Sequence, residues 1–64
     1  MSDWTVGIDR NNPYINPKVE PGRHPKMRWW GSDTFVVEAD TEQQAVGVAL
    51  GRHEALQERY RRSR

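Results

Sequence analysis

Residues 27–50 read MRWWGSDTFVVEADTEQQAVGVAL, and this stretch carries the pattern that decides the fold. Two short apolar runs flank Gly31, Ser32 and Asp33, which predicts a β-hairpin with these three residues as its loop. The facing pairs match in chemistry: Trp30 with Thr34, Trp29 with Phe35, Arg28 with Val36, Met27 with Val37 and Lys26 with Glu38. A shift of one residue would turn Arg28 inward, so we expect this register to be fixed.

Residues 40–60 predict a helix that follows the hairpin. Thr41 and Gln44 have the spacing of a capping box, and the arginines of the last turn suit the negative end of the helix dipole. At 100° per residue, one broad stripe is expected to cover the sheet: Ala45, Val46, Ala49, Leu50, His53, Leu56 and Tyr60.

A second strip of this helix consists of small residues: Gly47, Val48, Gly51 and Ala55. Each helical glycine costs roughly 1 kcal/mol relative to alanine. One interpretation is that these glycines have no structural role and lie on an exposed surface that tolerates substitution. The other is that the strip is the interface of a two-fold homodimer, in which small residues let two helices approach closely. We expect the homodimer, because a domain of 64 residues without cysteine or metal gains most from a second subunit.

The N-terminal residues predict a further strand, because Trp4, Val6 and Ile8 alternate with polar or small residues. Residues 11–25 carry a proline at every fourth position and predict a loop or arm. The expected fold is therefore a single α+β domain over residues 1–64, with element order strand, arm, strand, strand and helix. A three-stranded antiparallel sheet and one C-terminal helix on one of its faces form two layers. The expected inner face of the sheet is Trp4, Val6, Ile8, Met27, Trp29, Phe35, Val37 and Ala39.

Composition excludes several classes of protein. The chain has no cysteine and two histidines, too few for a structural zinc site, and we expect neither metal nor cofactor. No apolar run reaches the ~18 residues of a membrane span, and the first residues lack the pattern of a signal peptide, so a cytoplasmic location is expected. Nothing near His53 completes a catalytic set, which favours a non-enzymatic protein. The excess of Arg over Lys, with frequent Gly, Ala and Val, indicates a bacterial or phage origin.

The net charge of +1 hides an uneven distribution along the chain. Residues 1–30 hold five Lys/Arg and three Asp/Glu, residues 31–58 hold one Arg and six acids, and residues 59–64 hold four Arg. A domain dedicated to nucleic acid usually has a high overall pI. We therefore expect a local basic patch at most, and a frayed basic tail over residues 61–64.

Trp30 is the best functional pointer in the sequence. Adjacent strand residues point to opposite faces, so one of Trp29 and Trp30 must lie away from the core, and the hairpin register assigns that place to Trp30. The alternative is that the proline-rich arm folds over Trp30 and buries it. The expected partner-binding set is Arg23, Lys26, Arg28, Trp30 and Val36.

Two functions remain open at this point. The first is a small binding or adaptor module for protein–protein contact, whose partner is a second copy of the chain or a host or cellular protein. The second is a small DNA- or RNA-binding protein in which basic residues neutralise phosphates while an aromatic ring stacks on a base. Its expected contact residues are Arg23, Lys26, Arg28, Trp30, Arg59, Arg61 and Arg62.

Two resemblances bear on the fold. The order of elements resembles the three-strand-plus-helix modules that bind DNA at the N-terminus of some phage integrases. The stretch from Phe35 to Leu50 is similar to small antitoxin domains in which a strand runs into a Thr-capped, Ala-rich helix. No specific motif carries either resemblance, so no family is assigned.

Overall fold

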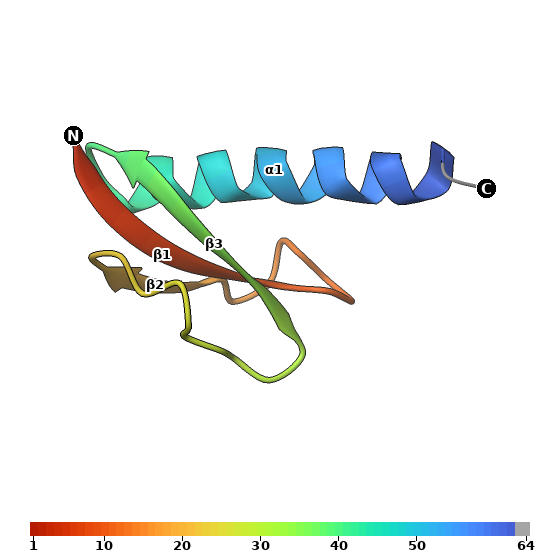
Figure 1. Cartoon of the computed structure of the whole chain (residues 1–64), viewed down its shortest axis with the longest axis horizontal. Helices are drawn as coiled ribbons and strands as arrows, with labels where there is room; N and C mark the ends of the chain where they lie inside the picture. The colour runs from red at the N-terminus through yellow and green to blue at the C-terminus, as the bar shows by residue number, and fades with distance from the viewer. Residues whose placement is uncertain (63–64) are drawn as a thin grey trace.

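The computed structural model describes the backbone of residues 1–62 and the side chains of residues 1–61. It contains strands β1 (Ser2–Asp9), β2 (Lys18–Pro21) and β3 (Ser32–Ala39), followed by helix α1 (Glu42–Arg62). The strands form one antiparallel sheet in the order β2-β1-β3, and α1 lies along one face of it (Figure 1). The predicted α+β class, with a three-stranded antiparallel sheet and one C-terminal helix, is confirmed.

The predicted hairpin between residues 27–30 and β3 is wrong. β3 pairs along its whole length with β1, from Ser2 opposite Ala39 to Asp9 opposite Ser32. Val37 therefore faces Trp4 instead of Met27, and Glu38 faces Asp3 instead of Lys26. β1 is eight residues long and carries the regular apolar alternation of Trp4, Val6 and Ile8, whereas residues 27–30 offer only four residues and directly follow a proline-containing turn. The longer ladder satisfies more backbone groups of β3.

The third strand of the sheet, β2, lies inside residues 11–25, which we predicted to be a loop or arm. β2 pairs with β1 from Gly7 opposite Lys18 to Trp4 opposite Pro21. Gly22 N donates to Asp3 O at 2.8 Å, which shows that odd-numbered residues of β1 direct their peptide groups toward β2. By the antiparallel alternation, the nitrogen of Pro21 then faces away from β1, where its missing N–H breaks no bond of the ladder.

The core lies between the sheet and the first half of α1. Its fully buried members are Val6, Ile8, Val37, Ala39, Ala45 and Ala49. Partly buried Trp4, Val19, Phe35, Val46 and Leu50 pack against them. The prediction of the inner sheet face is confirmed for Trp4, Val6, Ile8, Phe35, Val37 and Ala39, but Met27 and Trp29 are not among the residues that form this core.

The ends of α1 follow from local chemistry. Thr41 Oγ1 accepts a hydrogen bond from Gln44 N at 3.1 Å, and Gln44 Oε1 accepts one from Asp40 N at 3.1 Å, so the predicted cap is present. The second half of α1 extends beyond the sheet (Figure 1). Tyr60 is consequently exposed, and the buried stripe of the helix ends near half-buried Leu56.

Candidate partner-binding surface

The adjacent residues Trp29 and Trp30 have opposite environments. Trp30 is fully exposed, with a relative accessibility of 101%, which confirms that it lies away from the core and rules out the arm as its cover. Trp29 packs on buried Gly7: a Cβ atom at Gly7 would overlap indole Cε3 and lie 3.0 Å from Cδ2 and Cζ3. Gly7 alternates with the core residues Val6 and Ile8, so Trp29 covers the sheet face opposite α1. The prediction that Trp29 lies on the helix-covered face is therefore wrong.

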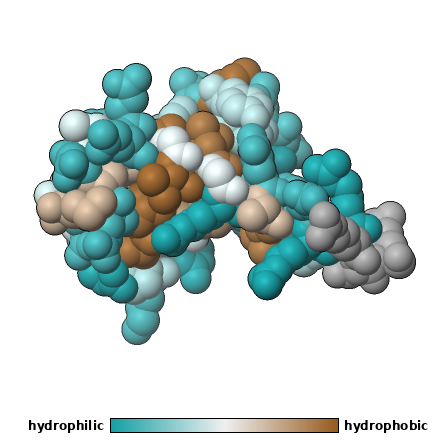
Figure 2. All heavy atoms as spheres, turned by 90° about the horizontal axis from the view of Figure 1, so that it is seen from above, coloured by the Kyte–Doolittle hydropathy of each residue, from teal (hydrophilic) through white to brown (hydrophobic). Residues whose placement is uncertain are grey.

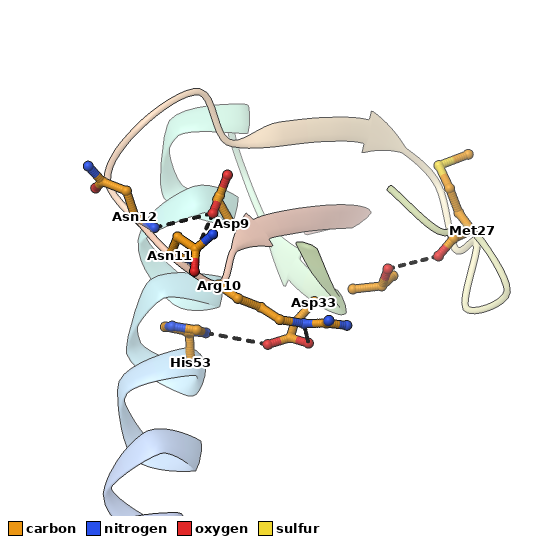
Figure 3. A network of polar contacts seen from close by, with 8 residues as sticks. Asp9, Arg10, Asn11, Asn12, Met27, Asp33 and His53 are labelled. Carbon is orange, nitrogen blue, oxygen red and sulfur yellow. Dashed lines mark hydrogen bonds and ion pairs between the residues drawn. The ribbon is translucent and has the colours of Figure 1, made fainter. Parts of the chain in front are cut away.

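Backbone and side-chain hydrogen bonds hold residues 22–31, the loop between β2 and β3 that presents Trp30 and is called the Trp30 loop below. Arg28 Nη1 donates to Pro25 O at 3.0 Å and to Met27 O at 2.9 Å. Thr34 Oγ1 also donates to Met27 O, at 2.8 Å, which ties the loop to β3 (Figure 3). Together with the packing of Trp29, these bonds fix the backbone on either side of Trp30.

The N-terminal part of the same loop is fastened to β1. Buried Thr5 donates its hydroxyl proton to Gly22 O at 2.8 Å, and its Oγ1 accepts from His24 N at 2.8 Å. Gly22 has a φ of 92°, which favours glycine at the bend between β2 and the loop. The loop therefore begins from a fixed point on the sheet.

The remaining residues of the expected partner-binding set lie on two different segments. Arg23 and Lys26 are exposed on the Trp30 loop. Arg28 lies there too, but its guanidinium group is committed to the loop's own carbonyls. Val36 lies on β3 opposite Thr5, on the face that α1 does not cover, and it does not face Arg28 as the hairpin register required. The structure thus unites Arg23, Lys26, Arg28 and Trp30 on one loop.

The basic tail lies elsewhere. Arg59 and Arg61 are exposed on the last turns of α1, which extend away from the sheet and the loop (Figure 1). Of the predicted frayed tail over residues 61–64, Arg61 and the backbone of Arg62 belong to α1, while the side chain of Arg62 and residues 63–64 lie outside the described residues. The arginines of α1 and those of the loop therefore do not form one continuous patch.

A polar cluster that the sequence did not reveal joins Arg10, the residue after β1, to β3 and α1. Arg10 Nε lies 3.0 Å from Asp33 Oδ1, and His53 Nδ1 lies 3.8 Å from Asp33 Oδ2 (Figure 3). His53 is only 3% exposed and its Nδ1 has no hydrogen-bond partner. A hollow of about 300 Å³ beside the cluster is lined in part by Arg10, Arg28, Phe35 and Asp33. The residues meet because the β1–β3 register places Ile8 opposite Asp33, which local pattern could not show.

A second long-range contact fastens the loop after β1 to the helix. Tyr14 Oη donates to Glu54 Oε1 at 2.7 Å. This hydrogen bond, together with the negative charge of Glu54, raises the pKa of Tyr14 above its ordinary value of 10.0. Both side chains are exposed, so the contact orients the loop without building a buried site.

Among residues 1–62, no group of three or more His, Cys, Asp or Glu side chains gathers as a metal site would require. No helix in the described part of the chain is long and apolar enough to cross a membrane.

Comparison of the chain with family models, with curated proteins and with solved structures finds no match.

Proposed function

We propose that the chain is a small non-enzymatic binding module that anchors itself to a protein partner through Trp30. The observation that carries this proposal is the complete exposure of an indole on a loop that is itself held in place. Tryptophan is enriched among the residues that dominate protein interfaces. A loop fixed before binding also loses less conformational entropy when the partner arrives.

Charge supports a protein partner over nucleic acid. The net charge is +1, and the last turns of α1, which carry Arg59 and Arg61, extend away from the Trp30 loop. Arg28, the basic residue closest in sequence to Trp30, uses its guanidinium group within the loop. Arg23 and Lys26 are exposed on the loop without such a commitment, and two cations make a small electrostatic contribution.

Nucleic-acid binding is the second candidate, favoured by one observation. Arg23 and Lys26 lie exposed on the same loop as a free indole, which is the combination that single-stranded nucleic acid uses for backbone neutralisation and base stacking. With so few cations, such binding is expected to be weak, nonspecific and steeply dependent on salt.

Affinity capture with three immobilised proteins tests the proposal: the natural chain, Trp30→Ala and the control Tyr60→Ala. Tyr60 is an exposed aromatic residue on the far end of α1, so its loss matches the chemistry of the change without touching the loop. We expect a protein that the natural chain and Tyr60→Ala retain and Trp30→Ala loses. Once that protein is purified, Trp30→Ala should weaken its affinity by roughly 30-fold or more, equivalent to about 2 kcal/mol.

The salt dependence of binding separates the two candidates. A Trp30-anchored protein contact should change little between low and physiological salt, and nuclease treatment should not release it. Release by nuclease together with a steep salt dependence would promote nucleic acid to first place. Equal retention by the natural chain and Trp30→Ala would overturn both assignments to this loop.

A further inference from the structure

The sheet has two open edges, and they are protected very differently. The β2 edge is short, from Lys18 to Pro21, and it carries a lysine and a proline, which are residues that discourage the addition of another strand. β3 is eight residues long; Ser32 N at its start already donates to Trp29 O of the loop, and the following residues Thr34-Phe35-Val36-Val37-Glu38 contain neither lysine nor proline. Long apolar edges of this kind pair with other strands unless something covers them.

The hydrogen bonds of β3 show which backbone groups face the open edge. Arg52 Nη1 donates to Val36 O at 3.0 Å, and Ser32 N donates to Trp29 O at 3.1 Å, so even-numbered residues direct their peptide groups away from β1. By the antiparallel alternation, the N–H groups of Thr34, Val36 and Glu38 also face outward. Within residues 1–62, the structure shows no hydrogen bond to any of these three amides.

The flank of α1 above this edge is made of small side chains. Arg52 reaches the β3 edge, so its side of the helix is the β3 side, and Glu54 reaches the loop after β1 on the other side. At 100° per residue, Val48 and Ala55 lie about 40° and about 60° from Arg52. Both are exposed, and Gly51 beside them has nothing within 4 Å of the place where a Cβ would stand. Gly47 lies about 140° from Arg52 and turns away from this flank.

The surface view agrees with this arrangement. Seen from above, apolar atoms are exposed alongside the first half of α1, whereas the second half is mostly hydrophilic (Figure 2). A single peptide strand added to β3 would occupy the edge but leave the helix flank uncovered. A second copy of the chain would cover the edge and the flank together.

We propose that two copies of this chain pair through their β3 edges, antiparallel, about a two-fold axis at Val36. Val36 then pairs with Val36 of the partner subunit, and Thr34 pairs with Glu38 of the partner subunit, so every outward amide finds a carbonyl. The carbonyl of Val36 has a second lone pair and can keep Arg52 as well. On the inner face, half-buried Phe35 lies opposite Val37 of the partner subunit, and because Val37 is already buried within its own subunit this pair adds little apolar burial.

The spacing of the layers fits the same axis. Neighbouring strands lie about 4.8 Å apart. α1 packs over both β1 and β3, and an axis midway between these strands would lie about half a strand spacing inside β3. The two helices would then run antiparallel about 10 Å apart, at the upper end of the usual 8–10 Å for packed helices. With Arg52 beside the axis, Val48 lies next to Ala55 of the partner subunit, and these small side chains leave space for Arg52 of both subunits.

The size of the surface sets the expected affinity. The edge from Asp33 to Ala39 is about 23 Å long, and one helix-on-sheet layer is about 10 Å high, which gives a flat area of a few hundred Å². Standard interfaces bury roughly 800 Å² on each partner. We therefore expect a reversible dimer with a dissociation constant in the micromolar range.

Sedimentation velocity and amide hydrogen exchange between about 1 and about 100 µM chain test the proposal. The mass should rise toward twice that of the chain. The amides of Thr34, Val36 and Glu38 should become protected as concentration rises, while those of Phe35 and Val37 are protected throughout. Val36→Pro removes an outward N–H without breaking a hydrogen bond between β1 and β3, and it should weaken the dimer by about ten-fold or more, while Val36→Thr should retain it.

A second pair of variants tests the helix flank without altering β3. Val48→Glu should weaken the dimer, because it places a charge against Ala55 of the partner subunit, whereas Gln43→Glu on the opposite side of α1 should not. A monomer at every concentration, or a dimer whose three edge amides stay unprotected, overturns the proposal. Trp30→Ala should leave the dimer unchanged, so this proposal and the role of Trp30 fail separately.

Discussion

The packing of Trp29 on Gly7 gives a sharp prediction for stability. Gly7 lies buried in the middle of β1, and its Cβ position is already occupied by the indole ring of Trp29. The overlapping atoms belong to the body of the ring, so a small movement of a flexible side-chain end cannot relieve the clash. Gly7→Ala must therefore push Trp29 off the sheet or shift the loop.

Two opposing effects determine how much Gly7→Ala changes the free energy of unfolding. Overpacking of this kind costs about 1–3 kcal/mol. Replacing glycine by alanine at an ordinary strand position gains about 0.4–1 kcal/mol, because the unfolded chain has less freedom to lose. We expect Gly7→Ala to lower the free energy of unfolding by about 0.5–2 kcal/mol, which is a large share of the stability of so small a domain.

A double-mutant cycle separates this clash from any other effect at position 7. In a Trp29→Ala background the ring is gone, so Gly7→Ala should become neutral or stabilising, and the coupling energy should be about 1–3 kcal/mol. Urea denaturation monitored by circular dichroism measures all four proteins. If Gly7→Ala had the same effect in both backgrounds, Trp29 would not lie on Gly7, and the account of the loop would be wrong.

Three further predictions concern the helix and its contacts. Gly47 is exposed with open space around it, so Gly47→Ala should raise the free energy of unfolding by about 1 kcal/mol in a urea titration; a loss of stability would mean that something packs there. Thr41→Ala removes the cap of α1 and should cost about 1 kcal/mol, with a loss of helical signal on heating; an unchanged midpoint would contradict the cap. The Glu54 hydrogen bond raises the pKa of Tyr14, so its contribution to stability is complete below the ordinary pKa and is lost as pH rises through the raised pKa. Glu54→Ala should return the pKa of Tyr14 toward 10.0 in an ultraviolet absorbance titration, with Tyr14→Phe identifying the signal; an unshifted midpoint would show that the bond is not formed in solution.

Local pattern predicted the elements whose signals are contained in their own residues. The alternation of Trp4, Val6 and Ile8 identified β1, and the Thr41 cap identified the start of α1, because these signals depend on neighbours in the chain. Strand pairing depends on every other strand as well. The side chains on the two sides of residues 31–33 are chemically compatible, but β1 is a longer strand for β3 to pair with.

The site was only partly predictable for similar reasons. β2 was not predicted because it contains Pro21. A proline argues against a strand unless its nitrogen faces an open edge of the sheet, and which way the nitrogen faces depends on the strand register. Gly7 did carry a usable signal, because a glycine inside an alternating strand often marks the close approach of another group, here Trp29. The contact of Arg10, Asp33 and His53 crosses three elements, so no short stretch of sequence contains it.

The central claim, that Trp30 anchors a protein partner, is tested most directly by fluorine NMR of the chain labelled with fluorotryptophan. The three tryptophans give separate signals, and Trp30→Phe identifies the one that belongs to the exposed indole. Addition of the captured partner should shift the Trp30 signal and shield it from solvent, while the signals of Trp4 and Trp29 change little. Saturating binding that leaves the Trp30 signal solvent-exposed and unshifted would contradict the account.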